Sequence, residues 1–140
     1  MRLHFPTVFH QPISSRMGVS RTKPLYPDVA SFLEANYWIP DLGRPVTLEA
    51  HQRRFFSDVF TADRNGKLPY QTVIYAAPKK SGKTEMGAMA AFAYAYTQDP
   101  WNEIYFIAND LESSQSRGFR ALTNSIEANP RIKGWNITKS

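Results

Sequence analysis

The stretch VIYAAPKKSGKTEMG, residues 73–87, constrains the fold of this chain more than any other. The apolar run QTVIYA, residues 71–76, has the length and β-branched content of a buried strand, and the alanine-rich pattern over 83–98 predicts a helix. A loop that joins a strand to a helix and ends in Gly-Lys-Thr is a setting in which backbone N–H groups and the helix dipole bind phosphate. The sequence therefore predicts a nucleotide site at this loop.

The residues of the loop have separate expected roles. Backbone N–H groups of Gly82, Lys83 and Thr84 can point at phosphate oxygens, and the Lys83 ammonium can reach the β- and γ-phosphates. The Thr84 hydroxyl is the expected ligand of the Mg²⁺ that accompanies ATP. The expected cofactors are thus ATP and Mg²⁺, and the expected ATP-binding residues are Ala77, Pro78, Lys79, Lys80, Ser81, Gly82, Lys83 and Thr84.

The opening of the loop departs from the common motif. Ala77 stands where a glycine usually relieves a tight backbone, and Pro78 lacks an N–H, so the conformation or the number of donors must differ. Lys79 and Lys80 add positive charge near the expected γ-phosphate and are both candidate catalytic residues. The alternative for either lysine is a solvated loop charge, and the alternative for the whole loop is a glycine turn with Lys83 in solvent.

The rest of the pattern predicts one domain over 28–140 behind an irregular arm, residues 1–27, which contains four prolines. DVASFLEANYW is expected to form a helix capped by Asp28, and TLEAHQRRFFSDVFT a second helix capped by Thr47. ADRNGKLP, residues 62–69, reads as a turn.

After the alanine-rich helix, EIYFIA at 103–108 is expected to be a second buried strand. Asn109 or Asp110 would cap a helix whose apolar face includes Phe119 and Ile126, and WNITKS would begin a further strand. Strand, helix, strand and helix in this order imply an α/β fold with a parallel sheet and right-handed crossovers.

Composition narrows the function less than the loop does. Seventeen Lys and Arg against twelve Asp and Glu give a net charge of +5, which suits a nucleic acid partner but also occurs in ordinary soluble proteins. The absence of cysteine excludes disulfides and cysteine-bound metal, and together with the lack of a signal peptide it favours a cytoplasmic protein. The apolar stretch MGAMAAFAYAY is too short to span a bilayer.

Three stretches in order, LEAHQRRFF, APKKSGKTE and IYFIANDLESSQSRGF, resemble the amino-terminal part of the ATPase domain of phage large terminase subunits, over roughly residues 45–140. The resemblance implies a P-loop NTPase (RecA-like) parallel sheet with flanking helices, of which this chain holds the first strands only. Lys79 aligns where that family often has an arginine acting on the γ-phosphate, and Lys80 competes for this role. Gln52 matches the glutamine that contacts adenine, although a surface glutamine is the plain alternative. Gln115 and Phe119 fit the third stretch, in which Ser116 replaces an alanine and Phe119 alone reads as core.

The same resemblance implies a motor that packages viral DNA into proheads in the host cytoplasm. Its partners would be double-stranded DNA, the portal, the small terminase subunit and further copies of the chain. No apolar run ending in Asp-Glu and no acidic nuclease cluster occurs in the sequence, so we expect a truncated product, a fragment or an incomplete reading frame that does not hydrolyse ATP alone. The alternatives are a helicase-like P-loop ATPase, a small-molecule kinase, or a basic DNA-binding or assembly piece with a vestigial loop.

Overall fold

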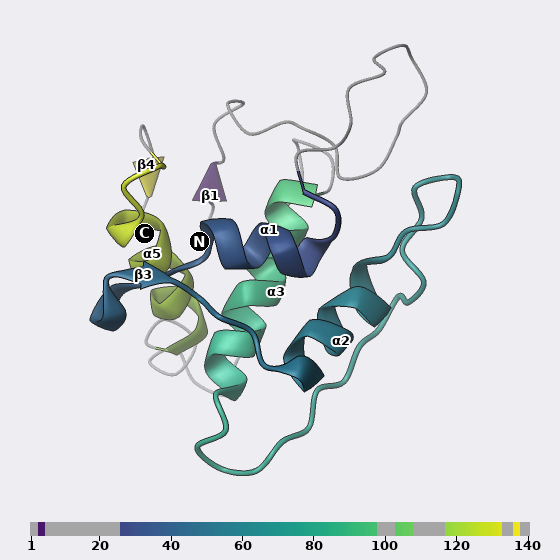
Figure 1. Cartoon of the computed structure of the whole chain (residues 1–140), viewed down its shortest axis with the longest axis horizontal. Helices are drawn as coiled ribbons and strands as arrows, with labels where there is room; N and C mark the ends of the chain where they lie inside the picture. The colour runs from purple at the N-terminus through teal and green to yellow at the C-terminus, as the bar shows by residue number, and fades with distance from the viewer. Residues whose placement is uncertain (1–2, 5–25, 98–102, 108–116, 133–135, 138–140) are drawn as a thin grey trace.

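The computed structural model describes residues 3–4, 26–97, 103–107, 117–132 and 136–137, so most of the expected arm lies outside the described residues. The helices are α1 (Val29–Asn36), α2 (Ala50–Phe60), α3 (Lys83–Thr97) and α5 (Phe119–Ala128), with a 3₁₀ turn at Pro40–Leu42. The strands are the two-residue pairs β1 (Leu3–His4) with β4 (Asn136–Ile137) and β2 (Trp38–Ile39) with β3 (Arg44–Pro45). Helix α3 lies at the centre, with α1 crossing it and α2 and α5 on either side (Figure 1).

Helix α1 forms where the apolar spacing predicts it. The Asp28 carboxylate accepts a hydrogen bond from the Ser31 backbone N–H at 2.6 Å, which confirms the expected N-cap. Phe32 and Leu33 are buried, as is the C-cap residue Tyr37 one helical turn after Leu33. The helix ends at Asn36, and after β2 the 3₁₀ turn and Gly43 at φ +59° turn the chain back into β3.

Helix α2 begins later than the sequence predicts. Its N-cap is Glu49, not Thr47, because the Thr47 hydroxyl instead accepts a hydrogen bond from Arg44 at 3.1 Å. The backbone N–H of Leu48 donates to the Glu34 carboxylate on α1 at 3.1 Å, and Arg53 forms an ion pair with the same carboxylate. A contact with α1 therefore sets the start of α2, and the predicted Thr47 cap is wrong.

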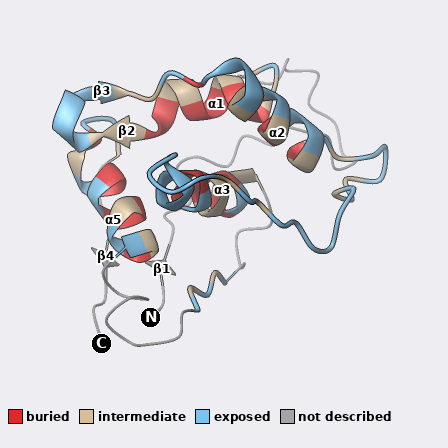
Figure 2. Ribbon diagram, turned by 90° about the horizontal axis from the view of Figure 1, so that it is seen from below, coloured by how far each residue is buried: buried red, intermediate tan, exposed pale blue. Residues whose placement is uncertain are grey.

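The core gathers around Phe92 in the middle of α3. Its ring stacks on Phe32 at a centroid distance of 5.8 Å and meets the edge of Tyr37 at 5.5 Å. From α5, Leu122 and Ile126 complete the core, as their spacing predicts. Figure 2 shows the buried residues on the facing sides of the helices. The predicted caps of this last helix, Asn109 and Asp110, lie outside the described residues.

The two expected strands do not form a sheet in the part of the chain that the structure describes. Residues 71–76 and 103–107 carry no strand pairing, and the strands that do form are antiparallel. Ile74 and Ile107 are 87% and 93% exposed, so neither is a buried strand residue. A parallel pair needs cover on both faces and further strands to be stable, and the described residues supply neither. The parallel P-loop sheet stays a prediction, while the predicted strand at WNITKS corresponds to the short antiparallel β4.

Candidate phosphate-binding loop

The loop of residues 77–82 leads directly into α3 and turns through two left-handed residues. Lys80 has φ +67° and Gly82 has φ +76°. Glycine adopts this region without a steric penalty, whereas a lysine there is strained by about 1–2 kcal/mol. The position of Gly82 immediately before α3 agrees with its expected role, since a side chain here would resist the turn that aims the helix end at the loop.

The Lys83 side chain folds back over the loop. Its Nζ donates to the backbone carbonyl oxygens of Ala77 at 2.6 Å and of Pro78 at 2.8 Å. The Ser81 hydroxyl donates to the same Pro78 oxygen at 2.6 Å. The opening and the end of the loop are thus tied together through one ammonium group, and Lys83 itself stays exposed to solvent.

The amino terminus of α3 supplies further donors beside Lys83. An early helical hydrogen bond runs from the Met86 N–H to the Gly82 carbonyl at 3.0 Å. The N–H groups of Lys83, Thr84 and Glu85 precede this bond and have no acceptor within the helix. Together with the positive end of the helix dipole they favour an anion. The exposed Thr84 hydroxyl lies in this first turn, where it is open to a metal ion or water.

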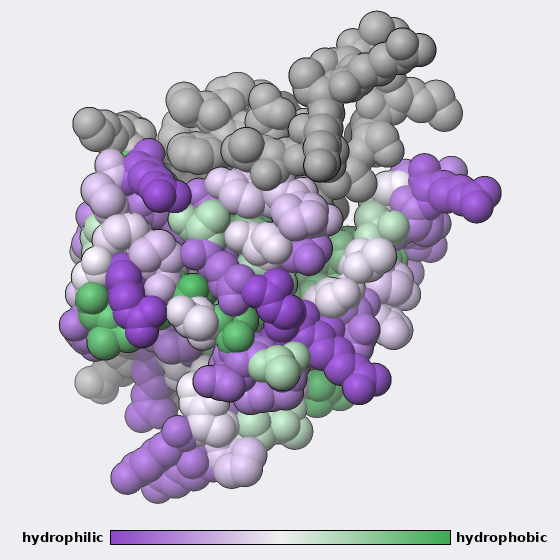
Figure 3. All heavy atoms as spheres, in the orientation of Figure 1, coloured by the Kyte–Doolittle hydropathy of each residue, from purple (hydrophilic) through white to green (hydrophobic). Residues whose placement is uncertain are grey.

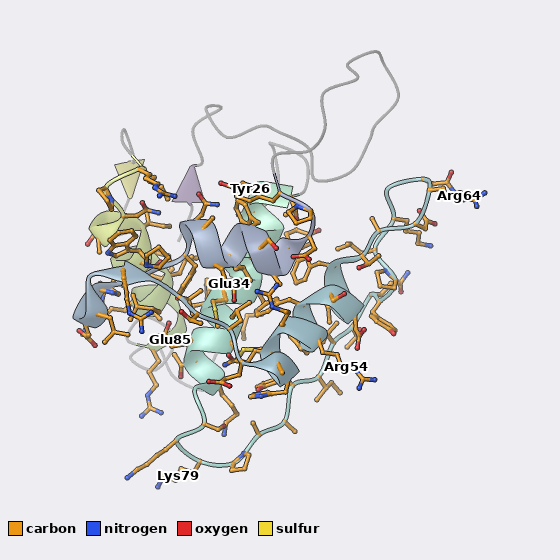
Figure 4. The ribbon with its side chains drawn as sticks, in the orientation of Figure 1. Tyr26, Glu34, Arg54, Arg64, Lys79 and Glu85 are labelled. Atoms are coloured by element: carbon orange, nitrogen blue, oxygen red, sulfur yellow. The ribbon has the colours of Figure 1, made fainter. Side chains whose placement is uncertain are left out.

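Lys79 and Lys80, the two candidate catalytic residues, are exposed on the outer side of the loop. Figure 4 shows Lys79 extending away from the protein at the lower edge of the molecule. Within the described residues neither ammonium forms an ion pair. Both are therefore long mobile charges beside the loop, and the arrangement gives neither one priority over the other.

Gln52 has a structural partner on its own helix. Its side-chain oxygen accepts a hydrogen bond from the Glu49 backbone N–H at 2.9 Å, which completes a capping box at the start of α2. Among the described residues it makes no hydrogen bond to the loop of residues 77–84. The expected contact of Gln52 with adenine would have to compete with this cap.

A buried tyrosine contacts the first turn of α3, directly after the loop, and no local sequence pattern predicts this contact. Tyr37 is fully buried, and its hydroxyl donates to the Glu85 carboxylate in the first turn of α3 at 2.8 Å. Burial, and then the negative charge of Glu85, raise the pKa of the Tyr37 hydroxyl well above its ordinary value. The two residues lie 48 positions apart, so only the packing of α1 on α3 brings them together.

A cavity of about 650 Å³ adjoins the loop between α2 and α3. Lys83 contributes to its wall at one end, and Met86, Gly87, Ala90, Ala91 and Tyr94 continue along α3. The opposite walls come from α2, from the segment after it and from both expected strand segments, through Phe55, Val59, Phe60, Leu68, Tyr70, Gln71, Val73, Tyr75, Glu103, Ile104 and Tyr105. The lining is mainly apolar and aromatic, with few charged groups.

Comparisons with protein-family models, with curated proteins and with solved structures returned no match for this chain. Within the described ranges, no helix is long and apolar enough to cross a membrane. The same ranges contain no group of three or more His, Asp or Glu side chains that could bind a metal ion.

Proposed function

We propose that residues 77–84 bind the triphosphate of ATP together with Mg²⁺. The observation that carries this proposal is the position of Lys83 at the amino terminus of α3, where its ammonium donates hydrogen bonds to the carbonyl oxygens of Ala77 and Pro78. An anion with several oxygens can replace both carbonyls as the partner of Lys83. Because phosphate oxygens carry full charge, the exchange gains stronger, charge-assisted hydrogen bonds.

The roles of the individual residues follow from their places in the loop. The N–H groups of Lys83 and Thr84 would donate to phosphate oxygens, and Gly82 keeps the backbone open for their approach. The Thr84 hydroxyl would bind Mg²⁺, which neutralises the charge of the β- and γ-phosphates. Lys79 and Lys80 are close enough in sequence for either to contact the γ-phosphate. The described residues offer no second carboxylate beside the loop to activate water, so binding without hydrolysis is proposed here.

The wider proposal is that the chain is the ATP-binding part of a DNA-packaging motor of the large terminase type, acting in the host cytoplasm. It rests on the loop and on charge: residues 49–83 contain seven Lys and Arg against three Asp and Glu. In Figure 3 the loop forms a hydrophilic projection at the lower edge of the molecule. Double-stranded DNA, the portal, the small subunit and further copies of the chain are the partners that this proposal implies.

Calorimetric titration with Mg-ATP tests the nucleotide site. Replacing Lys83 by Ala removes a charged donor and should weaken binding at least about tenfold, given the strength of hydrogen bonds to charged groups. Lys67→Ala is the matched control, because Lys67 is also an exposed lysine but lies in the 63–67 turn, and its backbone rather than its side chain makes the hydrogen bonds there. Absence of binding at millimolar Mg-ATP, with the three proteins alike, would exclude the proposal.

A basic nucleic acid-binding piece with a vestigial loop is the second candidate, and the charge excess over 49–83 favours it. A filter-binding assay on duplex DNA, with and without ATP at several salt concentrations, separates the two. DNA binding that is unaffected by ATP and falls steeply with salt, in a chain that does not bind ATP, would support the candidate with the vestigial loop.

A further inference from the structure

We propose that the cavity between α2 and α3 binds the base of the nucleotide whose phosphates lie on the loop. The inference rests on the proposed function, and it adds the site and the residues that recognise the nucleoside. The first argument is that the loop and the cavity are continuous. Lys83 belongs both to the loop and to the wall of the cavity, and Tyr75 of the cavity wall lies two residues before Ala77. A ligand bound at the loop would therefore meet the mouth of the cavity.

The dimensions of the cavity suit a nucleoside. Its volume of about 650 Å³ lies within the range of roughly 300–1,000 Å³ that cofactor and small-molecule sites occupy. Along α3 the floor is made by Gly87 and Ala90, which lie about 6 and 10 Å beyond Lys83 at the rise of an α-helix. These small side chains leave room for a flat ring, and an added Cβ at Gly87 would meet no other atom within 4 Å.

The walls offer aromatic rings in positions that an ordinary core would not leave open. Tyr70, Tyr94 and Tyr105 line the cavity from three different segments and are 57%, 41% and 71% exposed. Large aromatic side chains that stay accessible around one cavity are typical of a binding site, and stacking on a base uses their faces. Gln71 adds a polar group at the wall that can meet the edge of a base or a sugar hydroxyl, and Glu103 holds the Tyr105 hydroxyl, which donates to its carboxylate at 2.6 Å.

The hydrogen bond that Gln52 makes also favours the cavity as the base site. Its side-chain oxygen caps α2, so an adenine contact there would break the capping hydrogen bond. Binding of the base in the cavity leaves that cap intact. The cavity is therefore the better placed of the two candidate base sites.

The test compares two ligands that share the triphosphate but differ in the base. Mg-ATP and inorganic tripolyphosphate with Mg²⁺ are titrated by calorimetry into the wild-type chain, Tyr94→Ala, Tyr70→Ala and the control Leu42→Ala, which is exposed in the 3₁₀ turn and does not line the cavity. Adenosine alone is titrated as well. Thermal melts followed by circular dichroism show which variants stay folded. Two tyrosine variants on different segments are used, so that the test still stands if one of them does not fold.

We expect the wild type to bind Mg-ATP at least about tenfold more tightly than tripolyphosphate, and each tyrosine variant to lose about tenfold for Mg-ATP alone, as base stacking implies. Equal affinities for the two ligands, unchanged in the variants, would overturn the inference while leaving the phosphate site in place. If neither triphosphate binds, the proposed function fails. Adenosine then decides the cavity separately: binding weakened by Tyr94→Ala supports it, and no binding refutes it.

Discussion

Replacing Tyr37 by Phe tests whether the core supports the candidate loop through a single hydroxyl. The change removes the hydrogen bond to Glu85, 2.8 Å long, and leaves the ring to meet Phe92 at 5.5 Å as before. A hydrogen bond to a charged group contributes about 1.5–3 kcal/mol to stability. Because Glu85 is exposed, water can replace the lost hydrogen bond to its carboxylate in the variant, and we expect a loss at the lower end of this range. We therefore expect the free energy of unfolding to fall by about 1.5 kcal/mol at pH 8.

The pH dependence gives the same experiment a second readout. The pKa of Tyr37 is raised in the folded chain by burial and by Glu85, whereas an unfolded tyrosine titrates near pH 10. Above pH 10 the unfolded chain loses a proton that the folded chain keeps, so stability falls as pH rises, by about 1.4 kcal/mol per pH unit from this group. The Tyr37→Phe variant does not lose stability in this way, because it has no hydroxyl to titrate. The difference in unfolding free energy between wild type and variant should thus be constant below pH 9 and nearly absent by pH 11.

Urea unfolding followed by circular dichroism, from pH 7 to pH 11, measures both effects, and Tyr70→Phe at an exposed position is the control. A Tyr37→Phe variant as stable as the wild type at pH 8 would show that the hydroxyl contributes nothing. A difference that persists unchanged at pH 11 would refute the argument from the pKa.

Four further substitutions test other parts of the structure by the same urea assay. Gly82→Ala should destabilise by about 1–2 kcal/mol because of its positive φ, whereas Gly87→Ala within α3 should stabilise by about 0.5–1 kcal/mol; equal effects would contradict the loop geometry. Phe92→Ala should cost about 3–5 kcal/mol, and a loss under 1 kcal/mol would place Phe92 outside the core. Asn129→Ala should cost about 1–3 kcal/mol, since it removes the donor at 2.6 Å from the buried carbonyl of Asn36; no loss would mean that this carbonyl finds another partner.

The helices could be predicted because their signals are local. Asp28 and the apolar residues that follow it lie within one or two turns of one another, so the chain specifies α1 almost without help from the rest of the fold. The start of α2 could not be predicted in this way. It depends on Glu34, fourteen positions before Leu48, whose carboxylate accepts the Leu48 N–H and ties the residue before Glu49 to α1.

The expected strands show a different limit of the sequence. The β-branched runs at 71–76 and 103–107 indicate a preference for extended backbone, but a strand exists only where another strand supplies its hydrogen bonds. Both segments nevertheless line one cavity on the same side of α3. A right-handed crossover from one strand through a helix to the next would bring them to a common side as well. Within the described residues, the two segments lack the hydrogen bonds to a neighbouring strand that would make them a sheet.

The loop combines a part that the motif predicts and a part that it does not. Gly82, Lys83 and Thr84 follow from the Gly-Lys-Thr pattern, but Ala77 and Pro78 stand where that pattern is broken. These two residues are the ones whose carbonyl oxygens accept the Lys83 ammonium. Proline fixes its own φ and favours an extended residue before it, so the pair restricts the backbone that presents both oxygens. The departure from the common motif therefore restricts the backbone at the two carbonyl groups that accept hydrogen bonds from Lys83.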